Sequence, residues 1–263
     1  MDIISIVEEN IAEEHICCAL GNDKDSRQRE ANKKAWLSDR FKEGLVFRRL
    51  DARGKVFIEY MPIETVWKPI LGKNYLVINC LWVSGKYKKQ GYAKQLLELC
   101  LEDAKKRGKD GVVVATSPKK KPFLTDGRFY QKYGFEVVDE APPFFVLMVK
   151  KFNLDAPDPV FAPHTKSGEC ENKDGFTLMY SDQCPYMEPY INLYAERIRE
   201  LGMNAQVIKF ESHTQAQSMG CPFGTSSLYY NGKFVTHELL APKRLDAFLE
   251  QTTGIEIPES PTF

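Results

Sequence analysis

The chain has 263 residues, of which 43% are hydrophobic, so it is long enough to bury a substantial core and to form two domains. Thirty-six lysines and arginines balance thirty-six aspartates and glutamates, and the formal net charge is zero. This balance excludes a global attraction to nucleic acid or to an anionic membrane, so any charged site must be local.

The first half has the pattern of a mixed α/β domain. Residues 4–20 begin like a short strand and pass into a helix that carries the adjacent Cys17 and Cys18. Further helices are predicted at residues 25–44, 91–108 and 126–134, and strands or strand pairs at residues 45–61, 74–83, 111–116 and 136–152. A turn at residues 51–54 joins the first pair, and Gly54 is expected to supply a positive φ there. The order of these elements predicts a mixed sheet with flanking helices.

The chain is expected to divide near its middle. Residues 153–174 contain three prolines and many polar side chains without a sustained period, which is typical of a linker. We therefore predict one domain at residues 1–152 and a second at residues 175–263. The second should run strand, helix, strand, short helix, two strands and a final helix.

A cationic loop precedes the helix at residues 91–108. It contains Lys86, Lys88 and Lys89, and it ends at Gly91, where the helix presents unpaired N–H groups and the positive end of its dipole. Small residues at Gly91 and Ala93 would allow a phosphate to approach the main chain. From spacing alone, a solvated lysine-rich turn is an equally ordinary interpretation.

Two motifs resemble those of the GCN5-related N-acetyltransferases (GNAT). In the first, Lys88, Gly91 and Ala93 stand where the family has Arg or Gln, then Gly, then Gly or Ala in its acyl-coenzyme A loop. In the second, Tyr130 begins a Tyr-x-x-x-Gly-Phe segment. The lysine at the first position departs from the family, as does the lysine-rich segment at residues 117–127.

The resemblance implies an enzyme that transfers an acetyl group from acetyl-CoA to a primary amine in a ternary complex. The residues expected to bind acetyl-CoA are Leu81, Trp82, Val83, Lys88, Lys89, Gln90, Gly91, Tyr92, Ala93 and Lys94. Tyr130 is expected to act as general acid toward the departing thiolate. Glu59 is the candidate base, with Glu64 as a second candidate, although either could be a solvated surface acid. The acceptor amine is expected near residues 61–72, where Trp67 either lines a pocket or packs.

The second half resembles a thioredoxin-like domain, and the whole chain resembles the YoaP-type acetyltransferases. Cys184 lies at the first strand-to-helix turn, but Met187 stands where a second thiol would be and Gly224 stands where the fold has its cis-proline. Three interpretations remain open: an inert remnant, a thiol site formed by Cys184 alone or with Cys221, and a surface that binds a substrate or partner. At a helix N-terminus the thiolate of Cys184 would be favoured.

The remaining features give no other site. The seven cysteines lack metal-ligand spacing, so reduced thiols and no metal are expected. The acidic N-terminal stretch and the absence of a long apolar segment predict a cytoplasmic protein without a membrane partner. Two alternative functions stay open: a protein that binds acyl-CoA without turnover, and a thiol oxidoreductase that uses Cys184. The acceptor, either a small amine or a peptide amine, and the oligomeric state are not predicted.

Overall fold

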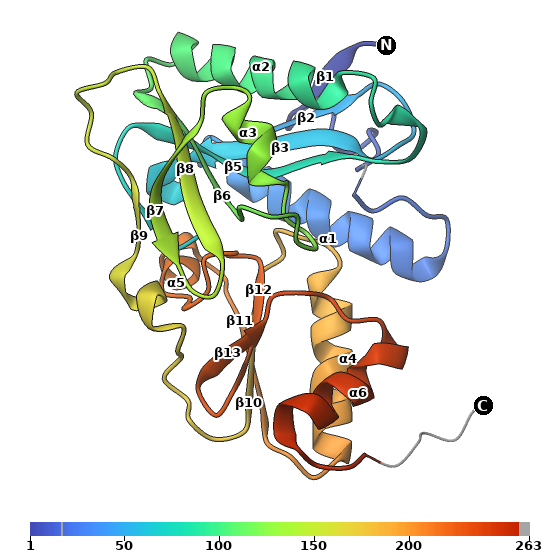
Figure 1. Cartoon of the computed structure of the whole chain (residues 1–263). Coiled ribbons are helices and arrows are strands. Elements are labelled where there is room, and N and C mark those ends of the chain that lie inside the picture. The colour runs from blue at the N-terminus through green and yellow to red at the C-terminus, as the bar shows by residue number, and fades with distance from the viewer. Residues whose placement is uncertain (17, 258–263) are drawn as a thin grey trace.

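The computed structural model describes residues 1–16 and 18–257, and its strands form two main sheets (Figure 1). The first sheet has seven strands in the order β1-β2-β3-β5-β6-β8-β7, and the second has four in the order β11-β10-β12-β13. The strands of the first sheet are β1 (Ile3–Ile6), β2 (Val46–Leu50), β3 (Val56–Pro62), β5 (Tyr75–Val83), β6 (Gly111–Thr116), β7 (Glu136–Ala141) and β8 (Phe145–Lys151). Those of the second are β10 (Phe176–Tyr180), β11 (Ala205–Lys209), β12 (Ser226–Tyr230) and β13 (Lys233–Thr236). The predicted α/β class and mixed sheet are confirmed.

Helices cover both faces of the first sheet. The helices of the chain are α1 (Lys24–Phe41), α2 (Tyr92–Lys106), α3 (Gly127–Gln131), α4 (Met187–Glu200), α5 (His213–Gln217) and α6 (Pro242–Thr253). In Figure 1, α1 and α2 lie on opposite sides of the first sheet, and the second sheet lies below it with α4 and α6. All six residues of β6 are buried, because this strand has apolar neighbours on both faces.

The first sheet opens between β5 and β6. The parallel ladder between these strands runs from the pair Tyr75–Gly111 to the pair Ile78–Val114 and ends there, although β6 continues to pair with β8 as far as Thr116. On the other side of β5, Glu59 pairs with Cys80 and Tyr60 with Ile78, which leaves Asn79 as the extra residue of a bulge. Because β5 bends away from β6 at this bulge, residues 79–83 keep one edge free of the ladder.

The second sheet is joined to the first by direct packing. The side chain of Lys68 donates a hydrogen bond to the Phe223 carbonyl at 2.6 Å, and Gln217 donates to the Val66 carbonyl at 3.1 Å. A Cβ atom at Gly224 would lie 2.8 Å from the Trp67 carbonyl oxygen, so glycine is needed for this approach. The two sheets therefore share a close interface.

Three local predictions are wrong. Residues 7–16 form turns instead of a helix, because the Asn10 side chain bonds the main chain of Val7 and Ser5 and competes with helical pairing. His15 therefore lies outside any helix, and Cys17 lies outside the described residues. Gly54 does not adopt a positive φ; it is a glycine because a Cβ atom there would lie 2.4 Å from the Tyr87 ring.

The segment predicted as a linker has secondary structure of its own. It contains β9 (Val160–Phe161), which pairs with β4 (Ile70–Leu71), and the 3-10 helix Pro163–Ser167. It is therefore packed against the first sheet. Among the described residues, no helix is both long and apolar enough to cross a bilayer.

Candidate functional site

A groove of about 640 Å³ lies where β5 and β6 separate. The free edge of β5 forms one wall, and the start of α2, the end of α3 and the segment 120–126 form the others. Among the residues that line it are Asn79, Leu81, Trp82, Val83, Lys88, Ala93, Val114, Thr125, Phe129 and Tyr130. The opening in the sheet thus brings the two predicted motifs, which begin at Lys88 and Tyr130, to one groove.

The loop before α2 has the conformation of an anion-binding turn. Gly91 is the N-cap of α2 with φ 85°, and Lys89 also has a positive φ of 62°. No heavy atom lies within 4 Å of the position that a Cβ atom on Gly91 would occupy, so the space in front of its main chain is open. The loop is anchored by the buried Tyr87, whose ring packs edge-to-face on Tyr92 at 6.1 Å. Free N–H groups, the helix dipole and open space together suit a phosphate group.

The predicted cofactor residues divide into two groups. Five of them line the groove, namely Leu81, Trp82, Val83, Lys88 and Ala93. The others, Lys89, Gln90, Gly91, Tyr92 and Lys94, lie in the same loop or the first turn of α2 but outside this lining. Lys94 is half-exposed and forms an ion pair with Glu98 at 3.6 Å, so it faces away along the outer side of the helix.

Tyr130 is buried at the inner end of the groove. Its ring packs against Phe129 and Phe135 at centroid distances of 5.2 and 5.3 Å, and only 1% of the residue is exposed. Burial raises the pKa of its hydroxyl, and a hydrogen bond with Thr125 opposes that shift in part. The phenol therefore holds its proton at neutral pH and is suited to donate it.

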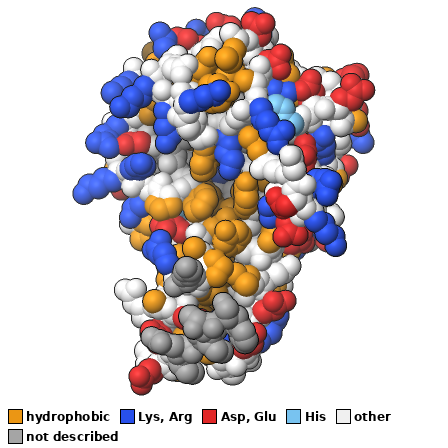
Figure 2. All heavy atoms as spheres, turned by 90° about the vertical axis from the view of Figure 1, so that its right-hand side faces the viewer, with side chains coloured by type: hydrophobic (Ala, Val, Ile, Leu, Met, Phe, Trp, Pro, Cys, Tyr) orange, Lys and Arg blue, Asp and Glu red, His pale blue; other side chains and the backbone are white. Residues whose placement is uncertain are grey.

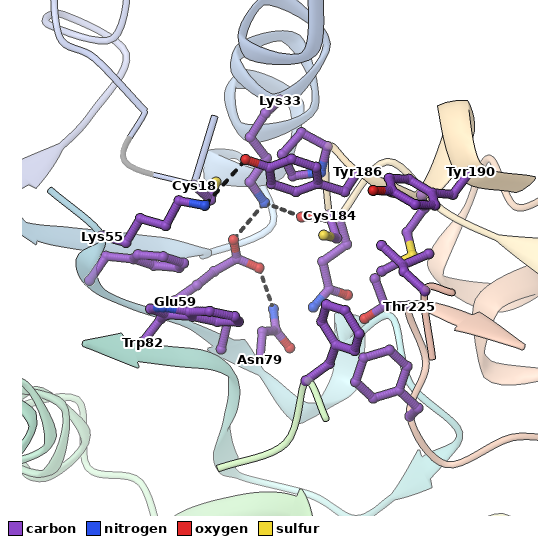
Figure 3. Close-up of a pocket in the computed structure, with 18 of the residues that line it drawn as sticks. Cys18, Lys33, Lys55, Glu59, Asn79, Trp82, Cys184, Tyr186, Tyr190 and Thr225 are labelled. Carbon is purple, nitrogen blue, oxygen red and sulfur yellow. Dashed lines mark hydrogen bonds and ion pairs between the residues drawn. The ribbon is translucent and has the colours of Figure 1, made fainter. Parts of the chain in front are cut away.

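A second cavity of about 350 Å³ adjoins the groove (Figure 3). The two share a boundary formed by Asn79, Cys80, Trp82, Phe123 and Phe223. Figure 3 shows side chains pointing into the cavity from two sides. Glu59, Asn79 and Trp82 come from strands of the first sheet, and Cys184, Tyr186 and Thr225 come from the segments just before α4 and β12. The bulge at Asn79 is thus the meeting point of groove and cavity.

Glu59 is buried in the wall of this cavity and is not a surface acid. Lys33 on α1 donates to Glu59 Oε2 at 2.6 Å, and the two side chains are 1% and 2% exposed. Asn79 Nδ2 donates to the other oxygen at 3.2 Å, and Lys33 also donates to the Gln183 carbonyl of the second sheet at 2.5 Å. The other candidate base, Glu64, is exposed and accepts from the Asn74 N–H.

Residues 61–72 do not line the cavity. Trp67 is 1% exposed and packs edge-to-face on Trp36 at 5.7 Å, so it is a core residue. This segment meets the second sheet through Lys68, as described above. The expectation that the acceptor binds against residues 61–72 therefore has no support from the geometry.

Cys184, in the turn before α4, is partly buried, and Cys221, before β12, is buried. Cys184 lines the cavity, whereas Cys221 does not, and both are free thiols. Burial raises the pKa of Cys184, and it raises that of Cys221 to about 12. This direction of the shift favours the protonated thiol at Cys184, so among the three open interpretations the reactive thiolate has the least support.

Four residues that line the cavity were not predicted from the sequence, namely Lys33, Lys55, Gln183 and Tyr186. Only Lys33 had a sequence signal, because it lies on the same helical stripe as the buried Trp36 and Leu37 at the i+3 and i+4 positions. The others gain their places from contacts across the interface of the two sheets.

The segment 117–126 closes the groove. The Thr125 hydroxyl donates to the Leu81 carbonyl on the free edge of β5 at 3.1 Å. The Pro122 carbonyl accepts from His237 Nε2 of the second sheet at 3.0 Å. The second sheet therefore supports the cover of the groove as well as one wall of the cavity.

Comparisons with known proteins agree with this geometry. Residues 9–135 match the model of the acetyltransferase (GNAT) family, and residues 205–246 match the YoaP-like model. An uncharacterized N-acetyltransferase YoaP of Bacillus subtilis (strain 168) is 42% identical over 249 residues, which span 95% of this chain and 98% of the relative. The chain belongs to the acetyltransferase (GNAT) family. The predicted enzyme class, an acetyltransferase that uses acetyl-CoA, agrees with this membership.

Two solved acetyltransferase structures match more than half of the chain. The PaiA N-acetyltransferase from Thermoplasma acidophilum, in complex with coenzyme A, is 18% identical, with a TM-score of 0.40, and covers 58% of this chain and 100% of its own. The aminoglycoside 6'-N-acetyltransferase from Enterococcus faecium is 15% identical, with a TM-score of 0.43, and covers 60% of this chain and 100% of its own.

Proposed function

We propose that this GNAT-family chain transfers an acetyl group from acetyl-CoA to a primary amine by direct attack, with the thioester at the bulge of β5. The observation that carries the proposal is the junction of the groove and the cavity at Asn79. A donor in the groove and an acceptor in the cavity would meet there without any movement of the sheets.

The groove fits the parts of acetyl-CoA in order. The loop from Lys88 to Gly91 offers main-chain N–H groups to the pyrophosphate, and the free edge of residues 79–83 offers main-chain groups to the pantetheine arm. The N–H groups beside the bulge are suited to hold the thioester oxygen and to stabilise negative charge on it.

The chain's own residues handle two protons. As the new C–N bond forms, the amine loses one proton, which Glu59 takes directly or through one water molecule. As the C–S bond breaks, its electron pair stays on sulfur, and Tyr130 gives that sulfur a proton. The products are an amide and the free thiol of coenzyme A, so charge and protons balance.

The proposal includes the division of the chain into an acetyltransferase domain at residues 1–152, a connecting segment at residues 153–174 and a thioredoxin-like domain at residues 175–263. The strand order β11-β10-β12-β13, with β10 parallel to β11 and antiparallel to β12, supports the thioredoxin-like interpretation. Cytoplasmic location stays a prediction.

Gly91→Val tests the donor site, with Gly108→Val as the matched control. Both glycines have a positive φ and open space around them, one at each end of α2, so valine should cost each a similar ~1–2 kcal/mol. In isothermal titration with coenzyme A, we expect Gly91→Val to weaken binding at least about ten-fold, because Cβ would occupy the phosphate space, while Gly108→Val should bind like the parent. Equal binding by the two variants would refute the donor site.

Turnover is tested separately by the release of free thiol from acetyl-CoA in the presence of a panel of amines. We expect release that depends on the amine. Tight binding of coenzyme A without turnover of any amine would leave a binding protein and would refute the transferase.

A further inference from the structure

The cavity beside the groove carries an unbalanced positive charge. Three charged side chains line it, namely Lys33, Lys55 and Glu59. Because Lys33 and Glu59 form an ion pair at 2.6 Å, their charges cancel and Lys55 remains. An occupant with one negative charge would therefore neutralise the remaining positive charge of the cavity.

Lys55 is half-buried and has no carboxylate partner in the part of the chain that the structure describes. Its Nζ donates to the Tyr186 hydroxyl at 3.3 Å and lies 5.2 Å from the centre of that ring. Lys55, Phe57 and Glu59 all line the cavity at alternate positions of one extended segment, with the two charged residues about 13 Å apart along the backbone. The side chains of Lys55 and Glu59 therefore leave the same face of this segment and both point into the cavity (Figure 3).

The end near Glu59 is rich in acceptor atoms. Asn79 Oδ1 and Gln183 Oε1 are buried and have no hydrogen-bond partner, and both residues line the cavity. Only 6% of Gln183 is exposed. Since buried acceptors without partners are costly, these two oxygens and the Glu59 carboxylate are suited to receive the N–H groups of an amine.

The remaining wall is apolar and aromatic. Trp82 is 38% exposed although it lies on a central strand, and it faces the cavity with Tyr186 and Tyr190 of the second sheet (Figure 3). Figure 2 shows a band of hydrophobic side chains running down the middle of the face that lies to the right in Figure 1. Aromatic walls of this kind suit a flat apolar group.

We propose that the acceptor is a small amino-carboxylate with a flat apolar side chain, such as an aromatic amino acid, and that the second sheet exists in part to select it. Its amine binds among Glu59, Asn79 and Gln183, its carboxylate pairs with Lys55, and its side chain packs against Trp82 and the tyrosines of α4. The volume of about 350 Å³ lies at the small end of ligand pockets and fits a molecule of this size.

This inference rests on the proposed function and defines its second substrate. The reactive form of the acceptor has a neutral amine and an ionised carboxylate. Its single negative charge therefore matches the unpaired positive charge of Lys55. The acetyl carbon forms a bond to the amine nitrogen while the bond to sulfur breaks, and the amine proton leaves through Glu59 as described above. The product keeps its carboxylate, so Lys55 is a binding residue and takes no part in proton transfer.

The test compares each amino acid with its decarboxylated counterpart, phenylalanine with phenethylamine and tryptophan with tryptamine, on the full chain. Thiol release should give kcat/KM at least about ten-fold higher for the amino acids. In Lys55→Met this preference should disappear through a higher KM for the amino acids, with the amines unchanged, and Lys55→Arg should restore most of it. Lys42→Met, an exposed lysine after α1, is the control and should keep the preference.

Titration of the same compounds into the protein in the presence of coenzyme A gives a readout that does not need turnover. We expect phenylalanine to bind and phenethylamine to bind at least about ten-fold more weakly, with Tyr190→Ala weakening phenylalanine but not coenzyme A. If both compounds bind equally or neither binds, the acceptor inference is wrong, whatever the transfer assay gives. If amines without a carboxylate are acetylated as well as the amino acids, the proposed function stands and this inference falls.

Discussion

Removal of one member of the Lys33–Glu59 pair should destabilise the protein strongly. In Lys33→Met the Glu59 carboxylate stays buried with Asn79 as its remaining donor, and the Gln183 carbonyl loses its partner. Breaking a buried ion pair from one side costs about 3–5 kcal/mol, and Glu59→Gln should cost a similar amount because it leaves Lys33 unpaired. For a chain of this length, that loss corresponds to a melting temperature lower by roughly 10 °C.

The double variant Lys33→Met/Glu59→Gln separates the pair from its surroundings. The double variant has neither charge, so no buried charge lacks a partner. The loss of stability should therefore fall to about 1–3 kcal/mol, which is the cost of leaving the Gln183 carbonyl unpaired. Denaturant unfolding can be followed by tryptophan fluorescence, because Trp36 and Trp67 are buried in the native core. Losses that simply add in the double variant would refute a coupled buried pair.

A surface pair of the same length provides the control. Lys173 and Glu169 are also 2.6 Å apart, but both side chains are about half exposed. Because water and salt screen an exposed pair, Lys173→Met should leave the unfolding midpoint almost unchanged. A loss as large as that of Lys33→Met would show that the distance between the charges, and not their burial, decides the effect.

Three further variants test the site and its cover. Tyr130→Phe should lower kcat roughly 100-fold or more without changing the affinity for coenzyme A, since only the proton donor is lost. The control Tyr133→Phe, on the neighbouring turn, should keep full activity in the thiol-release assay. Burial lowers the pKa of His237 from 6.5 to about 4, so the unfolded chain takes up the proton first as the pH falls. The stability measured by denaturant unfolding should therefore drop by about 3 kcal/mol between pH 6.5 and 4. This drop should be absent in His237→Leu. Burial lowers the pKa of Lys68 from 10.5 to about 8, so the native state loses its proton first as the pH rises. Buried cysteines with raised pKa values lower the stability of both proteins in this range, so the expected result is that the stability of the parent rises relative to that of Lys68→Met between pH 8 and 10.5.

The spacing of apolar residues was sufficient to predict most of the helices and strands, because each type of element has its own period. The apolar run of β6 and the amphipathic α2 were predicted close to their observed bounds. The pattern failed at residues 7–16, where the Asn10 side chain bonds the main chain of two preceding residues, Ser5 and Val7. A period of apolar residues carries no information on such a bond.

The candidate site divides in the same way. The loop at Gly91 and the segment at Tyr130 could be predicted, because each motif is contiguous in sequence. The Lys33–Glu59 pair could not, since it joins α1 to β3 and is completed by the Gln183 carbonyl 150 residues from Lys33. The choice among the three interpretations of Cys184 could not be made from the sequence, because the helix start was visible there while the covering first sheet, which contributes to the burial that raises the pKa of this thiol, was not.

The position of Gly224 explains how a strand-to-helix turn without a thiol pair can serve an acetyltransferase. A Cβ atom there would lie 2.4 Å from the Lys68 side chain, and φ is 77°, so only glycine lets this loop lie against the first sheet. That contact brings Phe223 and Thr225 to the cavity wall opposite Glu59, together with Cys184 from the neighbouring turn. This end of the second sheet therefore faces the cavity, and the partly buried Cys184 side chain forms part of the wall. Gly224→Ala should therefore shift this part of the cavity wall and change which acceptor is preferred. The affinity for coenzyme A, which is proposed to bind at the loop around Gly91, should stay as in the parent.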